Sequence, residues 1–378
     1  MLRYLTLFAV LFASGPLHAQ QARTEGEDSN EAIQLPKDAS PGDLVAFLDR
    51  MSSRDGATGS RFERAKAIFA AAEQLRGMDD ASDEQQLYAV RQAFFALIFI
   101  QRQEPEFYDR ERAALLASLR RDDRQAFKVF AVREDLVVES RTLTSDSAPE
   151  KANELAERFG EVTRSHGCDR ETVNLGRSLI RKMRQTKHFF SASRISFVMA
   201  DAMEASAEET VRAMAANYRA EARFLALPGN RVEFVCPLST GESVDWKDYE
   251  GKYVLVYYWH GHARYSGGLR SIKDWLMKHP RNFAVVGVYM GSPKALDGYV
   301  EEHELPWDNL VPDDIRRNPM AEYYGVRRLP VGILIGRDGN VVSVEAEGDE
   351  LDRLLTTMLE RPKTDAVTAG EGRNSDGR

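Results

Sequence analysis

The chain has 378 residues, and its 59 acidic residues outnumber its 51 basic residues, which gives a formal net charge of −8 at pH 7. This length predicts two or three domains, and the ordinary apolar content is enough to bury a sizeable core. A mildly acidic balance without a basic stripe argues against a nucleic-acid partner.

The first residues have the pattern of a secretory signal peptide over residues 1–19. Arg3 provides the positive start, residues 5–12 form a short apolar stretch, and a small residue stands at the expected cleavage point. The apolar stretch is too short to span a bilayer as a stable helix, and no later segment is expected to span one. We therefore predict an exported protein, periplasmic or extracellular. The polar stretches 20–40 and 361–378 are expected to be a disordered linker and a disordered tail.

Residues 41–226 are predicted to form an α-helical domain. Apolar side chains recur at helical spacing there, for example at Phe62, Ala65, Phe69 and Ala72. Further helices are expected over residues 107–119, 124–139, 148–165, 170–186 and 191–224, separated by Pro, Gly and Asp breakers. No fixed repeat is present, and the charge run at residues 120–124 is expected to be a solvated loop and helix cap.

The pattern changes after residues 227–230, which mark a predicted domain boundary. Strands are then expected over residues 232–236, 253–258, 282–289, 331–335 and 341–344, and helices over residues 265–278, 294–303 and 351–359. Residues 337–340 form a strong turn signal between the last two strands. Residues 228–360 therefore predict an α/β domain around a mixed sheet.

Several motifs follow one another in this second half in a specific order. They are Gly251-Lys252-Tyr253-Val254-Leu255-Val256, Trp259, Val285-Val286-Gly287-Val288, Leu305-Pro306-Trp307, Tyr324-Gly325-Val326-Arg327-Arg328-Leu329-Pro330 and Asp338-Gly339. Together they resemble the thioredoxin-like redoxins of the exported thiol–disulfide oxidoreductase group, the ResA/TlpA type. The resemblance implies a thioredoxin-like fold over residues 228–360 and, in the family, thiol–disulfide exchange.

The residues that would perform this exchange are replaced. The resemblance aligns Ala263 and Ser266 with the two cysteines of the family's Cys-x-x-Cys motif, which stands at the start of a helix where the thiolate is stabilised. Exchange requires a thiolate, and no cysteine follows Cys236. The family's Trp before the first cysteine aligns with His262, and its buried Asp beneath the site aligns with Tyr257. We predict a degenerate redox site without catalytic residues.

The resemblance also implies a peptide-binding groove. Pro330 aligns with the family's cis-proline, and the backbone of Leu329 with the segment that pairs with an extended peptide. Arg264 and Tyr265 replace the Gly-Pro often found between the cysteines, and both are residue types that serve as binding anchors. The predicted binding residues are Trp259, His262, Arg264, Tyr265, Leu329 and Pro330.

The predicted function is therefore binding or scaffolding of a protein or extended peptide, without a cofactor or metal. The rival prediction is a thiol–disulfide oxidoreductase or antioxidant redoxin, as the family would suggest. A third reading, a purely structural envelope protein, rests on the helical half alone.

Other interpretations of single residues stay open. His260 and His262 could contribute to a metal site or be exposed loop histidines. Ser266 could act as a nucleophile with His262 as base, or serve as a polar residue in the first helical turn. Cys168 and Cys236 could form one disulfide in an oxidising compartment or remain two unpaired thiols, and Cys236 could be reactive.

Overall fold

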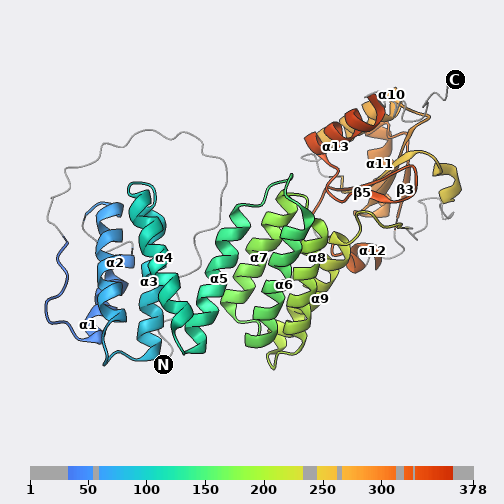
Figure 1. Ribbon diagram of the computed structural model, residues 1–378. Helices are drawn as coiled ribbons and strands as arrows, with labels where there is room; N and C mark the ends of the chain where they lie inside the picture. The colour runs from blue at the N-terminus through green and yellow to red at the C-terminus, as the bar shows by residue number, and fades with distance from the viewer. Residues whose placement is uncertain are drawn as a thin grey trace, which may run out of the picture. The chain divides into compact units, whose positions relative to one another are not determined.

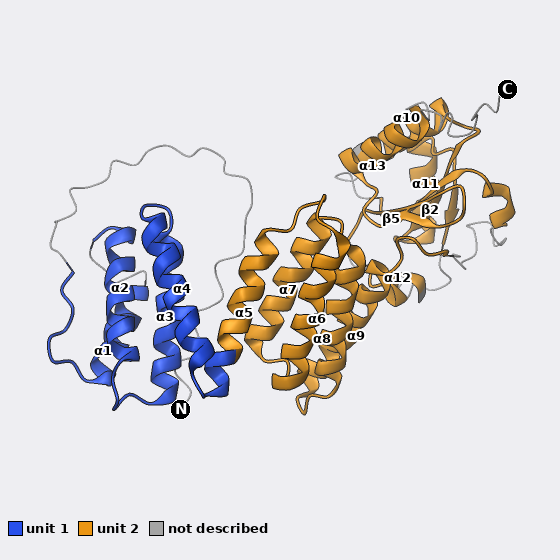
Figure 2. Ribbon diagram, viewed as in Figure 1, with its two compact units in different colours: residues 1–128 blue, residues 129–378 orange. Residues whose placement is uncertain are grey.

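The computed structural model describes residues 33–53, 59–232, 245–261, 266–311, 319–326 and 328–360. The expected signal peptide and tail, and all but the first residue of the expected strand 232–236, lie outside these ranges. Two compact units divide the chain after Lys128 (Figure 2). None of the helices within the described ranges combines the length and apolar content that a membrane span requires.

The first unit is helical (Figure 1). Its helices are α1 (Pro41–Ser52), α2 (Arg61–Arg76), α3 (Asp83–Ile100) and α4 (Pro105–Arg121). Ser40, Ser60 and Ser82 each precede a helix and accept a hydrogen bond from the backbone three residues on, while that residue's side chain bonds back. Each of these capping boxes satisfies two backbone N–H groups that would otherwise lack partners.

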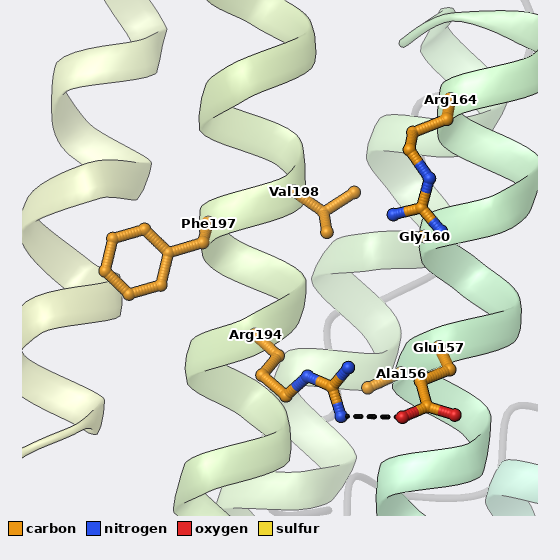
Figure 3. A pocket seen from close by; sticks show the side chains of 7 residues that line it. All are labelled: Ala156, Glu157, Gly160, Arg164, Arg194, Phe197 and Val198. Carbon is orange, nitrogen blue, oxygen red and sulfur yellow. Dashed lines mark hydrogen bonds and ion pairs between the residues drawn. The ribbon is translucent and has the colours of Figure 1, made fainter.

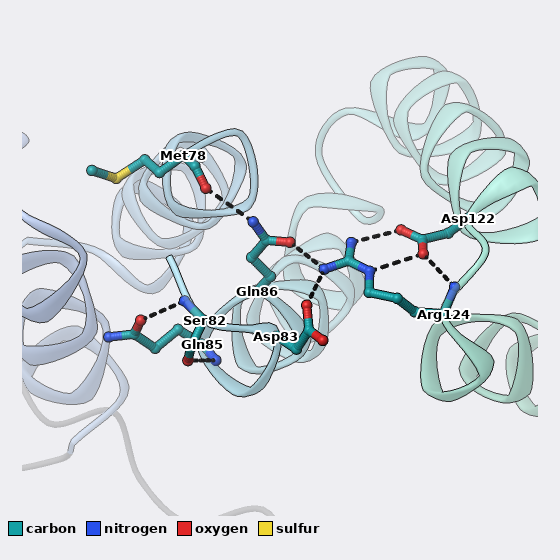
Figure 4. Close-up of polar contacts among 7 residues, drawn as sticks. All are labelled: Met78, Ser82, Asp83, Gln85, Gln86, Asp122 and Arg124. Carbon is teal, nitrogen blue, oxygen red and sulfur yellow. Dashed lines mark hydrogen bonds and ion pairs between the residues drawn. The ribbon is translucent and has the colours of Figure 1, made fainter. Parts of the chain in front are cut away.

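The expected solvated charge run between α4 and α5 is more ordered than a loop of free charges. The Arg124 guanidinium lies 2.6 Å from Asp122 and 2.6 Å from Asp83, and it donates to Gln86 at 2.6 Å (Figure 4). The same guanidinium carbon sits 3.9 Å from the centre of the Phe127 ring. Arg124 therefore ties this turn to the start of α3.

The second unit begins with five helices. They are α5 (Gln125–Arg141), whose first residues precede the division, α6 (Pro149–His166), α7 (Arg170–Gln185), α8 (Phe189–Glu204) and α9 (Glu209–Leu225). The expected continuous helix over 191–224 is wrong, because the chain turns between α8 and α9. The Ser206 hydroxyl accepts the Glu208 N–H at 3.2 Å, and Arg212 donates to the Ser206 carbonyl at 2.8 Å. These local bonds satisfy the backbone where the helix stops.

A five-stranded mixed sheet follows, with strand order β3-β2-β1-β4-β5. The strands are β1 (Tyr253–Trp259), β2 (Phe283–Tyr289), β3 (Asp308–Leu310), β4 (Val331–Ile335) and β5 (Val341–Ser343). β1, β2 and β3 are parallel, whereas β4 is antiparallel to β1 and to β5. Four strands occur near their expected positions, and β3 is an addition that the sequence did not signal.

The helices around the sheet are α10 (Ser266–Lys278), α11 (Pro293–His303), α12 (Pro319–Tyr323) and α13 (Gly348–Leu355). A short 3-10 helix, η1 (Trp246–Tyr249), precedes β1, and a π-helical turn, η3 (Thr356–Glu360), follows α13. α12 was not expected from the sequence. The sheet with these helices confirms the expected α/β organisation of the second half around a mixed sheet.

The two faces of the sheet belong to different cores. One face, with Leu255, Tyr257 and Leu334, packs against Leu269 of α10 and Leu351 of α13. The other face, with residues such as Val254, Val256 and Ile333, belongs to a core that continues into the helices α5 to α9. The helical and sheet parts of the second unit therefore share one hydrophobic core.

The predicted domain boundary is also hydrogen-bonded to the sheet. The Gly229 N–H donates to the Val341 carbonyl at 2.8 Å, and the Val341 N–H donates to the Asn230 carbonyl at 2.9 Å. Residues 228–231 thus run beside β5 rather than forming a free linker. The proposed bounds 41–226 and 228–360 remain a prediction, while the compact units divide elsewhere.

Candidate binding site

The candidate site lies where β1 ends and α10 begins. Parallel strands place their carboxyl ends at one edge of a sheet, which is where open α/β proteins commonly bind ligands. His260 and Gly261 leave β1 at this edge, and Val331 at the start of β4 pairs with Tyr258 beside it. The four residues 262–265 lie outside the described residues, as does the Ser266 side chain, although Ser266 is the first residue of α10.

Four of the predicted site residues lie in this undescribed loop, so their roles remain predictions. They are His262, Ala263, Arg264 and Tyr265. Cys236 also lies outside the described residues, and Cys168 is a half-buried free thiol. Burial and the nearby Asp169 carboxylate raise the pKa of the Cys168 thiol, which makes it a poor nucleophile at neutral pH.

Trp259 lies beneath the edge and not on its surface. Its side chain is 1% exposed, and its indole Nε1–H donates to Asn309 Oδ1 at 3.1 Å. The Asn309 amide in turn donates to the Trp307 carbonyl at 3.2 Å, and the Tyr289 ring packs 4.8 Å from the indole. Trp259 thus joins β1 to β2 and β3, and direct contact with a ligand would require this indole to move.

His260 is exposed and stacks on Tyr289, with ring centres 6.1 Å apart and planes 25° apart. Its partner in the metal hypothesis, His262, is not described. Among the side chains that the structure does describe, no group of three or more His, Cys, Asp or Glu residues is placed to hold a metal ion.

The second wall of the site is the segment before β4. The Leu329–Pro330 peptide bond is cis, as expected. Leu329 and Pro330 are half-buried, Arg328 is exposed, and the Leu329 side chain packs against the core shared with the helices. No hydrogen bond joins the Leu329 backbone to another residue in the described part of the chain. This backbone is therefore a candidate for pairing with an extended peptide.

Tyr257 fills the space beneath the start of α10. Its side chain is 1% exposed, and a methyl group added at Gly268 would lie only 2.9 Å from its hydroxyl oxygen. Glycine at position 268 thus allows the phenol to reach the first turns of α10. Burial, and secondarily the nearby Glu347 carboxylate, raise the pKa of Tyr257, so the phenol stays protonated across the physiological range.

Glu347 is an ionisable group that the sequence analysis missed. Its Oε2 accepts the Gly332 N–H at 3.2 Å, two residues after Pro330. Burial is the main reason that its pKa rises to about 7, and the neighbouring Glu345 adds to the rise, whereas the Gly332 hydrogen bond and Arg184 oppose it. Glu347 stands in the acidic run 345–350, a pattern that predicts a solvent-exposed segment. Its burial comes from residues far away in the sequence.

The residues around Glu347 form a strap, defined here as Glu345, Ala346 and Glu347, that crosses β4. Ala346 donates its N–H to the Gly332 carbonyl at 2.9 Å, and a methyl group at Gly332 would lie 2.0 Å from the Ala346 oxygen. Only glycine leaves room for this crossing. Glu345 faces the helices, where Arg184 of α7 reaches it at 2.8 Å.

A concavity lies on the helical part, between α6 and α8. It has a volume of about 220 Å³ and is lined by Ala156, Glu157, Gly160, Arg164, Arg194, Phe197 and Val198 (Figure 3). Arg194 of α8 donates to Glu157 of α6 at 3.1 Å across it. This ion pair occupies one end of the concavity, which makes it a weaker candidate than the sheet edge.

Comparison with known proteins gives structural likeness only. No protein-family model matches the chain, and no curated protein matches it. A thiol-disulfide oxidoreductase from Bacteroides fragilis is 20% identical, with 34% of this chain and 100% of that chain covered and a TM-score of 0.32. A thiol:disulfide interchange protein from a Bacteroides species is 22% identical, with 36% and 93% covered and a TM-score of 0.33.

A secreted disulfide oxidoreductase of Mycobacterium tuberculosis, homologous to Escherichia coli DsbE, is 19% identical. It covers 29% of this chain and 79% of its own, with a TM-score of 0.25. At these values the likeness establishes neither an activity nor a family for this chain. The fold rests on the topology described above.

Proposed function

We propose that this chain is an exported binding or scaffold protein whose thioredoxin-like part belongs to the ResA/TlpA type and has lost its redox cysteines. The observation that carries the proposal is the start of α10. This helix follows β1 where the redox helix stands in the family, and its first residue is Ser266. Ala263 and Ser266 hold the two cysteine positions, and residues 237–378 contain no cysteine.

The ligand is a protein or an extended peptide bound between the loop 260–265 and the Leu329–Pro330 segment. Three features support this choice. The Leu329 backbone has no partner among the described residues, His260 is exposed after the end of β1, and Arg264 and Tyr265 supply anchor-type residues in the loop sequence. Strand addition would then use backbone hydrogen bonds for affinity and these side chains for selectivity.

Binding to an array of unstructured synthetic peptides tests the proposal. Tyr265→Ala and Arg264→Ala are each expected to weaken binding of the captured peptides by on the order of 1 kcal/mol or more, which is about fivefold. Arg270→Ala is the matched control, because Arg270 is an exposed arginine of α10. Unchanged binding in both loop variants, with an intact fold, would remove the groove hypothesis.

An insulin-reduction assay separates binding from the rival enzymatic function. The purified chain is expected to leave insulin disulfides intact, because neither Ala263 nor Ser266 can form a mixed disulfide. Turnover that survives the combined Cys168→Ala and Cys236→Ala changes would contradict the degenerate-site proposal. Turnover lost in Cys236→Ala alone would identify Cys236 as a relocated nucleophile.

A further inference from the structure

One exposed aromatic side chain, shortly before Leu329 in the sequence, is held in place from the helical part. Tyr323, the last residue of α12, is 53% exposed. The Arg223 guanidinium of α9 lies 4.3 Å from the centre of its ring and also donates to its carbonyl oxygen at 3.3 Å. The Tyr324 ring packs edge-on at 5.0 Å. An exposed tyrosine with this many contacts is fixed in one orientation before any ligand arrives.

The backbone after Tyr324 is fixed by the same helix. Gly325 has a positive φ of 64°, and a methyl group there would lie 3.0 Å from the Ala220 Cβ of α9. Glycine thus lets the chain turn directly against α9 and continue towards Leu329. From Tyr323 to Arg328 there are five residue steps, which reach at most about 17 Å when fully extended. Arg223 and Tyr323 are in contact, and Arg328 follows Tyr323 within that reach, so these three residues are called here the α9–α12 surface.

The two arginines of this surface lack carboxylate partners. Within the described part of the chain, neither Arg223 nor Arg328 forms an ion pair, whereas Arg219, one turn earlier in α9, contacts Asp201 and Glu204 at 2.8 and 2.6 Å. Glu322 is exposed on α12 and contributes one negative charge. Among the described residues Arg223, Glu322 and Arg328 the charge balance is positive, in a chain whose net charge is −8.

We propose that the α9–α12 surface receives an acidic, extended segment of a partner polypeptide, bound in continuity with the Leu329 backbone. The proposal rests on the proposed peptide-binding function and specifies the ligand's charge. Arginine offers a planar set of donors that suits carboxylates, and a fixed tyrosine adds contact area without a large loss of side-chain freedom on binding. The ordering of Tyr323 by Arg223 lowers the cost of forming the complex.

The test uses the purified full chain and three synthetic fluorescent peptides of equal length with the same alternating apolar pattern. Their variable positions carry Glu, Gln or Lys, and binding is followed by anisotropy. The Glu peptide is expected to bind about tenfold more tightly than the Gln peptide at low salt, and this preference should shrink as salt screens the charges. The Lys peptide should bind most weakly.

Arg223→Gln and Arg328→Gln are each expected to weaken the Glu peptide about three- to tenfold and to leave the Gln peptide unchanged. Arg219→Gln is the matched control and should change neither. Arg223→Gln also removes contacts to Tyr323 of α12, so a loss of binding in that variant can come from a loosened helix. Arg328→Gln alters an exposed side chain and therefore tests the charge alone.

Two outcomes would overturn the proposal and leave the proposed function standing. They are equal binding of the Glu and Gln peptides, or retention of the Glu preference in both arginine variants, while binding still depends on Arg264 and Tyr265. If none of the three peptides binds, and none is captured from the array either, the proposed function itself fails.

Discussion

The two faces of the five-stranded sheet are stabilised by different parts of the chain. The face with Leu255 and Tyr257 packs against α10 and α13, which come from the same half of the sequence. The face with Val254 and Val256 shares a core with helices that end at Leu225, before the sheet begins. One face thus rests on a local core, and the other makes the sheet depend on the helical part, while the candidate site at the sheet edge has residues over both cores.

The largest expected effect tests the shared core. Leu225 of α9 is fully buried in the core that also contains Val256 and Ile333. Leu225→Ala should lower the free energy of unfolding by about 2–5 kcal/mol, because it removes apolar contacts and leaves a cavity. Hydrogen exchange should also show faster exchange in β4, although the substitution lies in a helix.

Leu97→Ala is the control for this comparison, because Leu97 is equally buried but belongs to α3 in the first unit. It should reduce stability without affecting exchange in β4. Unchanged exchange in β4 of the Leu225→Ala protein would mean that the sheet is stable without the helical core, as an independent 228–360 domain would be.

The second prediction concerns the local face. Gly268→Ala places a methyl group 2.9 Å from the Tyr257 hydroxyl oxygen, and overpacking of this kind costs about 1–3 kcal/mol of stability. Tyr257→Phe removes that oxygen. In the Tyr257→Phe background the same Gly268→Ala change should be neutral, or stabilising by up to about 1 kcal/mol, because alanine is the better helix former. Chemical denaturation of the four proteins measures the difference, and equal costs in both backgrounds would place Tyr257 elsewhere.

The strands of the sheet were largely predictable from the sequence, and the predicted bounds of β1, β2 and β4 were close. β1, β2 and β4 are runs of apolar and β-branched residues, and the turn at 337–340 has the residue types of a hairpin. β3 has only three residues, Asp308–Leu310, which is too short for a periodic pattern to show. The shared core was not predictable, because buried apolar residues do not reveal which segment they face.

Motifs in the sequence name several residues of the candidate site, but they do not reveal the burial or the pKa of its side chains. Trp259 and Leu329–Pro330 were named from the order of the motifs, but no pattern in the sequence indicates that Trp259 is fully buried. Glu347 was missed because its raised pKa comes from tertiary neighbours. An acidic residue beside a helix start looks, in one dimension, like an ordinary helix-capping charge.

The third prediction uses the raised pKa of Glu347 to test the burial of the strap. Glu347 has an ordinary pKa near 4.5 when unfolded and about 7 when folded, so folding favours its protonated form. Below pH 4.5 both states are protonated and nothing is lost. As pH rises from 4.5 through 7 the unfolded state ionises first, and the native state loses stability, with the full loss reached above pH 7.

Glu347→Gln should remove this loss. The variant is expected to be about 1–2 kcal/mol more stable relative to wild type at pH 8.5 than at pH 4, after allowance for partial exposure of the carboxyl group. Denaturation curves at the two pH values measure the difference. Glu350→Gln is the control, because the pKa of Glu350 is lowered by its bond to Arg353 and should give a trend of opposite sign. A stability difference between Glu347→Gln and wild type that does not vary with pH would contradict the burial of Glu347.

The smallest expected effect is the contribution of one ion pair, as distinct from apolar packing, to the attachment of the sheet to the helices. Arg184 of α7 contacts Glu345 at 2.8 Å, and both side chains are partly exposed, so the pair should contribute about 0.5–1 kcal/mol of coupling in a double-mutant cycle of Arg184→Ala and Glu345→Ala. The Glu350–Arg353 pair lies within one helix at 2.8 Å and should give about 0.3 kcal/mol. Salt should weaken both couplings. If the Arg184–Glu345 coupling is zero while Leu225→Ala still increases exchange in β4, this ion pair does not help to hold the sheet, and the apolar core and the Lys187 ion pairs with Glu345 and Glu350 remain. If the coupling is clearly larger than that of the control pair, the ion pair adds to the apolar core in connecting α7, through the strap, to β4.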